Sequence, residues 1–230
     1  MKPFTFKQFQ IQQSKDVFRV GTDGVLLGAL ADVEHAAKVL EVGTGTGLIS
    51  LMLAQRNAEA HFLGLDINEE AAAITQLNFE NSPFYTRLKN KFQDFKTFET
   101  EERFDLIVSN PPYFEESGSG KDKIARQTVE LNFMQLISKA SKLLSECGIF
   151  SVIIPIEAGE VFISIAKENE LFLSRRVNIK GIENSKTKRL VLEFSSEQKK
   201  TYESDFIIEK SPRQYSDQYL ELTKEFHVFK

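Results

Sequence analysis

The chain has 230 residues, of which 41% are hydrophobic and 27% charged, and its formal net charge is −4. This composition suits one soluble domain with a packed core, and the acidic balance excludes binding of nucleic acid through bulk positive charge. The single cysteine, Cys147, excludes an internal disulfide. The polar N-terminus does not resemble a secretory signal, and no apolar run reaches the roughly 18 residues of a membrane span. We therefore expect a cytoplasmic protein without a membrane segment.

Short apolar runs alternate with helix-forming segments from residue 38 onward. Strands are expected at 38–42, 61–67, 85–92, 104–110, 148–155, 172–182 and 189–195, and helices at 48–57, 68–81, 129–146 and 157–170. Strands separated by helices predict βαβ units and an α/β fold with a doubly wound, mostly parallel sheet. No helix separates the last two strands, so they should form an antiparallel pair at one edge.

No domain boundary is visible in the chain. We expect a single domain over 1–230, with an N-terminal extension (1–37), a catalytic core (38–195) and a C-terminal tail (196–230).

The segment VLEVGTGTGLISL (39–51) has the order strand, glycine loop, helix. Gly43, Gly45 and Gly47 allow a tight turn and a close approach of the backbone to a ligand, and the following helix N-terminus offers free N–H groups. The dinucleotide fingerprint requires a third glycine where this chain has Leu48, and no Lys-Ser/Thr follows as in a P-loop. NAD and FAD are therefore disfavoured.

Two acidic residues follow the next two strands. Asp66 ends the second strand, where a carboxylate accepts the hydroxyls of a ribose. Asp94 follows the third strand, where it would meet an adenine amino group. For each, the alternative is a helix cap or a solvated loop acid.

The stretch SNPPYF (109–114) follows the apolar run FDLIV. Two prolines cannot continue a strand, because neither has an N–H to donate. Asn110, Pro111, Pro112 and Tyr113 therefore form a rigid, polar corner with an aromatic face. The alternative is a strand breaker without a catalytic role.

No other pattern suggests catalysis by a base or a metal. His35, His61 and His227 are scattered, and no zinc spacing is present. We expect no metal cofactor.

The run EVGTGTG, then Asp66, Asp94 and NPPY, resembles the class I S-adenosylmethionine-dependent methyltransferases that act on amino groups. The resemblance implies a seven-stranded Rossmann-like sheet whose last pair is antiparallel. It also implies that S-adenosylmethionine is the cofactor. The residues that would contact it are Glu41, Gly43, Thr44, Gly45, Gly47, Asp66, Ile67, Asp94 and Asn110.

In this chemistry the exocyclic amine is a poor nucleophile, and the sulfonium is a strong electrophile. The enzyme must place the nitrogen in line with the methyl group. The Asn110 side-chain oxygen and the Pro111 carbonyl would accept the two N–H bonds, and Tyr113 would stack on the planar substrate.

Three further segments resemble the bacterial tRNA1(Val) adenine-37 N6-methyltransferase family. They are FRVGTDGVLLGALA (18–31), IARQTVELNF (124–133) and YSDQYLELTKEFHVF (215–229). The resemblance implies methyl transfer to N6 of adenine 37 in a tRNA, by an enzyme that we expect to be a monomer. Thr22 and Asp23 would fold over the active site, or would simply begin a helix.

Two other functions share these motifs. A protein glutamine N5-methyltransferase of release factors uses NPPY, as do other RNA or DNA amino-methyltransferases, but the helical substrate domain typical of the glutamine enzymes is missing here. A non-catalytic cofactor-binding module is the third interpretation. Six basic residues between 175 and 189 could line a route for a phosphate backbone, or could form a solvated face: Arg175, Arg176, Lys180, Lys186, Lys188 and Arg189.

Overall fold

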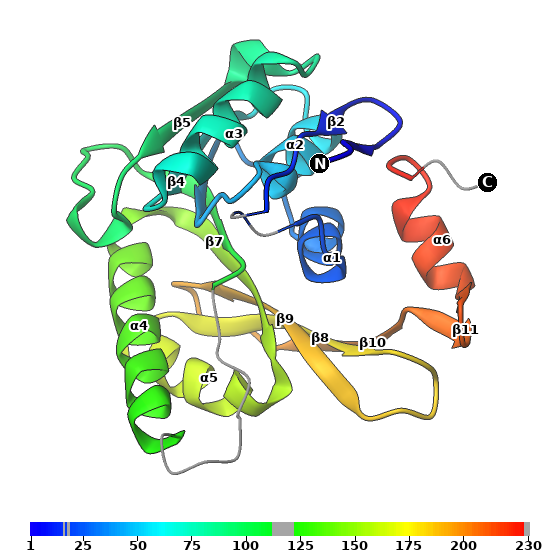
Figure 1. Ribbon diagram of the computed structural model, residues 1–230. Helices are drawn as coiled ribbons and strands as arrows, with labels where there is room; N and C mark the ends of the chain where they lie inside the picture. Colours follow the sequence, from blue (N-terminus) through cyan, green and yellow to red (C-terminus); the bar gives the residue numbers. More distant parts are fainter. Residues whose placement is uncertain (16, 18, 112–121, 228–230) are drawn as a thin grey trace.

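The computed structural model describes residues 1–15, 17, 19–111 and 122–227, with side chains from Phe133 onward in the last of these ranges. One eight-stranded sheet crosses the molecule, in the order β10-β8-β9-β7-β6-β3-β4-β5 (Figure 1). Its strands are β3 (Lys38–Val42), β4 (His61–Asp66), β5 (Leu88–Phe92), β6 (Phe104–Ser109), β7 (Leu144–Pro155), β8 (Phe172–Lys180), β9 (Thr187–Ser195) and β10 (Tyr202–Ile207).

The predicted doubly wound class is confirmed. All neighbouring strands are parallel except β9, which is antiparallel to β7 and to β8. The seven expected strands are present, and the expected antiparallel pair is β8–β9.

The sheet also has an eighth strand, β10, which comes from the segment expected to be a tail. As a result, β8 and β10 both lie between β9 and the edge of the sheet. Phe206 is the only hydrophobic residue of YESDFI that is buried, so this strand lacks the apolar pattern of an inner strand.

In the described part of the chain, six α-helices cover the two faces and one end of the sheet. They are α1 (Thr22–Leu30), α2 (Leu48–Arg56), α3 (Glu69–Glu80), α4 (Asp122–Leu143), α5 (Gly159–Glu168) and α6 (Asp217–Thr223). Three 3-10 turns accompany them: η1 (Tyr85–Arg87), η2 (Phe95–Thr97) and η3 (Ile156–Ala158). Two small hairpins, β1 (Phe4–Thr5) with β2 (Gln10–Ile11) and β11 (Glu209–Ser211) with β12 (Gln214–Tyr215), lie near the chain ends.

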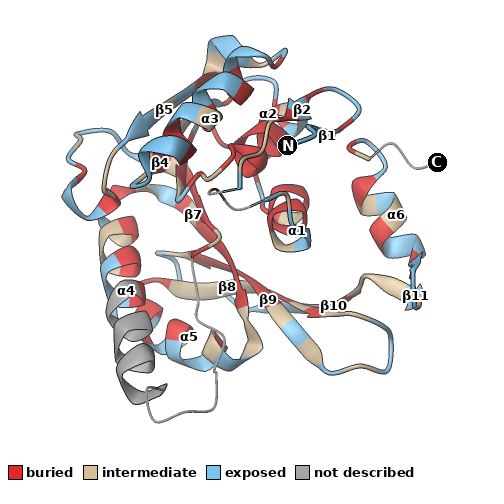
Figure 2. Ribbon diagram, in the orientation of Figure 1, coloured by how far each residue is buried: buried red, intermediate tan, exposed pale blue. Residues whose placement is uncertain are grey.

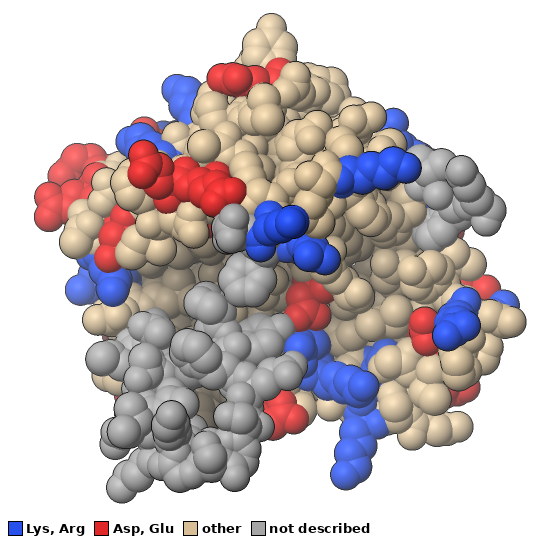
Figure 3. Space-filling view, in the orientation of Figure 1, with Lys and Arg blue, Asp and Glu red and all other residues tan. Residues whose placement is uncertain are grey.

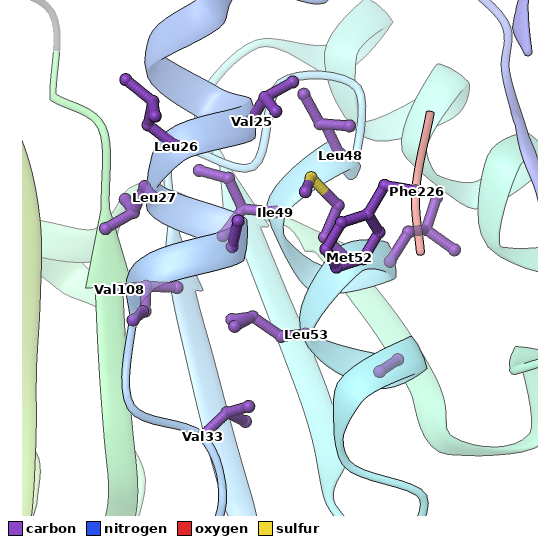
Figure 4. Packing of buried hydrophobic residues seen from close by; sticks show 14 of the residues in the cluster. Val25, Leu26, Leu27, Val33, Leu48, Ile49, Met52, Leu53, Val108 and Phe226 are labelled. Atoms are coloured by element: carbon purple, nitrogen blue, oxygen red, sulfur yellow. The ribbon is translucent and has the colours of Figure 1, made fainter. Parts of the chain in front are cut away.

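Two hydrophobic clusters fill the space on either side of the sheet, and the buried residues follow the strands and the inner helix faces (Figure 2). The first cluster joins one face to α1, α2 and the chain ends, and the second joins the other face to α4 and α5. Figure 4 shows Leu27 of α1, Leu53 of α2 and Val108 of β6, which all belong to the first cluster. The two helices approach closely, because a Cβ on Gly28 would lie 2.9 Å from the Met52 side chain.

Candidate active site

Three residues of the predicted site share a row at the carboxyl edge of the sheet. The last residue of β3 pairs with Leu65 of β4 on one side and with Ser109 of β6 on the other. Gly43, Asp66 and Asn110 directly follow these three paired residues, so each lies at the carboxyl edge of the sheet. The chain order reverses between β3 and β6, which is where open α/β sheets bind their ligands.

The glycine loop between β3 and α2 has the backbone that its sequence predicts. Gly43, Gly45 and Gly47 all have positive φ, at 75°, 61° and 79°. A Cβ on Gly43 or Gly45 would meet nothing within 4 Å, whereas one on Gly47 would lie 2.6 Å from Phe79. The first two glycines therefore border open space for a ligand, and the third permits close packing.

Thr44 of this loop forms hydrogen bonds with the backbone of β3 and β4. Its hydroxyl donates to the carbonyls of Glu41 and Leu65, at 3.3 and 3.2 Å, and its N–H donates to Leu65 at 3.1 Å. Contact between Thr44 and the cofactor stays a prediction.

Asp66 is tied to the loop and still has acceptor capacity. Its Oδ2 accepts the Gly45 N–H at 2.7 Å and its Oδ1 accepts the Asn68 N–H at 2.9 Å. A carboxylate has about four lone-pair positions, so two remain for the hydroxyls of a ribose. Ile67 is 65% exposed beside it. Contact between Ile67 and the cofactor stays a prediction.

Glu41 is a buried acid in β3, with 1% of its surface exposed. Its Oε2 accepts the N–H and the hydroxyl of Ser50, at 3.1 and 2.5 Å, whereas its Oε1 has no partner among the described residues. Burial raises the pKa of Glu41 to about 8, although the two Ser50 donors oppose the rise and Asp66 adds to it. A buried oxygen without a donor is suited to a bound cationic or N–H group.

Asp94 follows the next strand, two residues beyond the partner of Asp66. Its Oδ1 accepts the Lys96 N–H at 2.9 Å, and its Oδ2 lies 3.7 Å from the Lys96 ammonium. It therefore caps η2, which was the alternative to cofactor binding for this residue. A contact between Asp94 and adenine stays a prediction.

The NPPY corner begins at the same row. Asn110 is half-buried and Pro111 is buried. The Ser109 hydroxyl donates to the carbonyl of Val42 at 2.9 Å, which fixes the end of β6 against β3. Pro112 and Tyr113 lie outside the described residues.

Thr22 and Asp23 form the first turn of α1, after Gly21 as the N-cap. Asp23 Oδ2 accepts Arg189 Nε at 2.9 Å, and Arg189 pairs with Pro155 at the carboxyl end of β7. The start of α1 is thereby fixed at the same edge of the sheet as the NPPY corner. Sequence reasoning missed this ion pair, because 166 positions separate its members.

The basic stretch of residues 175–189 is largely neutralised. Four of its members form ion pairs, which are Arg175–Glu193, Arg176–Glu160, Lys180–Asp205 and Arg189–Asp23. Lys186 and Lys188 are exposed and make no ion pair with a described residue within 4 Å. Figure 3 shows two groups of Lys and Arg near the centre of this face with acidic side chains between them, so the cationic surface is narrower than the sequence indicates.

Other kinds of site are not found in the described part of the chain. No described helix has both the length and the apolar character to cross a membrane. Within the described ranges, no group of three or more His, Cys, Asp or Glu side chains is placed to hold a metal ion.

Comparison with known proteins identifies the family. The profile of the methyltransferase small domain matches residues 8–160. A tRNA1(Val) (adenine(37)-N6)-methyltransferase of Flavobacteriaceae bacterium (strain 3519-10) is 54% identical over 230 residues, which is 100% of both chains. The chain belongs to the tRNA1(Val) (adenine(37)-N6)-methyltransferase family. Another member, from Phocaeicola vulgatus, is 44% identical over 98% of this chain and 97% of its own.

The fold of this methyltransferase is also found in solved structures. A predicted O-methyltransferase from Agrobacterium tumefaciens superposes with a TM-score of 0.71 at 17% identity, over 89% of this chain and 96% of its own. At that identity the likeness shows the fold alone.

The methyltransferase uses S-adenosylmethionine, and the residues present fit this cofactor. The open space at Gly43 and Gly45, the spare acceptors of Asp66 and the unpartnered Oε1 of Glu41 lie around one end of β3. The two glycines leave room for the ligand to approach the backbone. Asp66 offers acceptors for the ribose hydroxyls, and Glu41 offers an acceptor for an amino group.

Proposed function

We propose that this protein transfers the methyl group of S-adenosylmethionine to the exocyclic N6 of adenine 37 in tRNA1(Val). The observation that supports the proposal is the pairing of Val42 with Ser109 at the β3–β6 switch point, because Gly43 and Asn110 are the residues that follow this pair. The target amine and the cofactor loop are then neighbours. The names of relatives 54% and 44% identical to this chain support the choice of acceptor.

The bound cofactor supplies an electrophilic methyl group. The Asn110 side-chain oxygen and the Pro111 carbonyl accept hydrogen bonds from the two N–H bonds of the adenine amine, which favours a pyramidal nitrogen. These are fixed dipoles in a partly buried site, so they stabilise charge as it develops without reorganising. The nitrogen–methyl bond forms as the methyl–sulfur bond breaks, and the amine then loses a proton to solvent. Tyr113 supplies the stacking surface for the base.

A base in an anticodon loop can reach this corner more readily than a base in a duplex. It leaves a single-stranded loop, so less stacking and pairing is lost when it turns out. We expect the enzyme to act as a monomer in the cytoplasm, where unmodified tRNA is present.

Methyl transfer from labelled cofactor to total tRNA, purified protein and duplex DNA, each from a strain lacking this gene, tests the proposal. N6-methyladenosine in tRNA alone is expected after nucleoside digestion and mass spectrometry. Label in a protein glutamine, with none in tRNA, would replace the proposal with the glutamine N5-methyltransferase.

A further inference from the structure

One face of α3 holds the glycine loop. Thr75, Asn78 and Phe79 are 0%, 1% and 1% exposed, and their spacing places them on the same side of the helix. The Thr75 hydroxyl donates to the Gly45 carbonyl at 2.9 Å, and Asn78 Nδ2 donates to the Thr46 carbonyl at 2.8 Å. Phe79 packs against the next residue of the loop. A loop rich in glycine loses much conformational entropy when it is ordered, so these contacts reduce the entropy that remains to be lost when a ligand binds.

Asn78 has a second set of partners in the N-terminal arm, which we define as residues 4–13. Its Oδ1 accepts the Gln12 N–H at 2.7 Å, and its Nδ2 donates to the Gln12 carbonyl at 3.2 Å. The primary amide is the group that supplies two donors and an acceptor at this short reach. One buried side chain therefore joins the glycine loop to a segment 66 positions away in the sequence.

The arm continues this connection to the start of α1 and to the C-terminus. Gln13 Oε1 accepts the Val20 N–H at 3.0 Å, two residues before α1. At its other end, the Lys7 N–H donates to the Phe226 carbonyl at 2.8 Å, and Phe6 stacks on His227 with ring centroids 5.5 Å apart. The arm is thus positioned between the cofactor loop, the helix that carries Asp23, and the C-terminal segment.

We propose that Asn78 is a positioning residue that couples cofactor binding at the glycine loop to the N-terminal arm. A ligand that fixes the Thr46 carbonyl also fixes the Asn78 amide, and through it both backbone groups of Gln12. Coupling of this kind is reciprocal: if the arm strengthens cofactor binding by a given factor, the cofactor stabilises the arm by the same factor. The inference rests on cofactor binding by this family and not on the identity of the methyl acceptor.

Hydrogen exchange at the backbone N–H of Gln12 measures this coupling in the full chain, because the Asn78 side chain accepts that N–H. The probe is S-adenosylhomocysteine at saturating concentration, with its affinity measured separately by calorimetry. In the wild-type protein the ligand should slow exchange at Gln12 by about 5-fold or more, the lower end of typical coupling factors. Asn78→Ala should exchange rapidly with or without ligand and bind the ligand about 10-fold more weakly.

Asn81→Ala is the matched control. Asn81 lies just beyond the same helix and is exposed, and its Nδ2 donates to the Leu77 carbonyl at 2.8 Å. This variant should retain both the ligand affinity and the effect of the ligand on Gln12. Thr75→Val removes a donor to the loop without touching the arm, so it should weaken ligand binding but leave Gln12 protected in the free protein.

The wild-type measurement decides the question even if Asn78→Ala does not fold. Exchange at Gln12 that is unchanged by bound ligand would overturn the coupling. Failure of the wild-type protein to bind S-adenosylhomocysteine in the calorimeter would instead contradict the cofactor assignment, and the proposal with it.

Discussion

The carboxylate of Glu41 accepts both the backbone N–H and the hydroxyl of Ser50, at 3.1 and 2.5 Å. Ser50 lies in the first turn of α2, where the N–H groups have no partner within the helix. A side chain of β3 thus accepts one of the N–H groups that would otherwise lack a partner at the start of α2. The arrangement uses one carboxylate oxygen and leaves the other, Oε1, for a ligand.

The raised pKa of Glu41, about 8 instead of 4.5, predicts how stability depends on pH. The folded protein binds this proton more tightly than the unfolded chain does. The contribution is therefore complete below pH 4.5 and is lost as pH rises through about 8, at roughly 1.4 kcal/mol per pH unit between these two values. The free energy of unfolding of Glu41→Gln, measured by denaturant titration, should decline less than that of the wild type between these limits. Parallel curves for the two proteins would contradict the buried, protonated state.

Cofactor binding should release a proton from Glu41. An amino group beside Oε1 favours the carboxylate, so the group should ionise on binding at pH 7, where the free protein holds it protonated. Calorimetry in two buffers of different ionisation enthalpy should give close to one proton released by the wild type and none by Glu41→Gln. Equal release by both proteins would assign the proton to another group.

Gly45→Ala should mainly weaken cofactor binding, and Gly47→Ala should mainly lower the stability of the fold. Both residues have positive φ, so alanine costs about 1–2 kcal/mol of backbone strain at either position. Only at Gly47 would the new Cβ also collide with Phe79, at 2.6 Å. Gly47→Ala should therefore lower the Tm more, whereas Gly45→Ala should weaken cofactor binding more, because its methyl group enters the open space. Equal losses of Tm would show that the two sites are packed alike.

Asn110→Ala should reduce kcat by about 10²–10³-fold, the typical loss of one preorganised hydrogen-bonding group. Its effect on cofactor affinity should be much smaller, because the amide is expected to act on the acceptor amine. Ser109→Ala removes the neighbouring hydroxyl bond to Val42 and serves as the control for disturbance of the strand end. Unchanged turnover of Asn110→Ala would remove the proposed mechanism and favour a binding module.

Lys186 and Lys188 should contribute to tRNA binding. They lie at the start of β9, which is at the carboxyl edge of β7, and described acids do not pair with them. The double change to alanine should raise KM for tRNA and lower the slope of log affinity against log salt by about 2, one for each lost phosphate contact. Lys142→Ala is the control, because Lys142 lies in the last turn of α4, just before the start of β7 and therefore at the opposite edge of the sheet. An unchanged salt slope would place the RNA elsewhere.

The sequence predicted those parts of the molecule that depend on local pattern. The strands, the helix expected at 68–81 and the tight turn at the loop glycines follow from short-range chemistry. Strand β10 was not predicted, because its own sequence lacks an apolar pattern. Its place at the edge of the sheet depends on its pairing with β8.

Long-range side-chain contacts were also beyond prediction. The bonds of Asn78 to Gln12 and of Asp23 to Arg189 join segments 66 and 166 positions apart. The residues around one partner give no indication of which distant residue it will contact. For the same reason, the stretch of basic residues gave no sign that most of its charges are paired in space.

Methylation of a defined tRNA tests the central claim most directly. The substrates are an unmodified transcript of tRNA1(Val) with adenine at position 37, and the same transcript with uracil there, which has no exocyclic amine. We expect one N6-methyladenosine per molecule in the first and none in the second, with Asn110→Ala slower on the first by about 10²–10³-fold. Equal methylation of the two transcripts, or of neither under conditions in which the enzyme binds its cofactor, would contradict the claim.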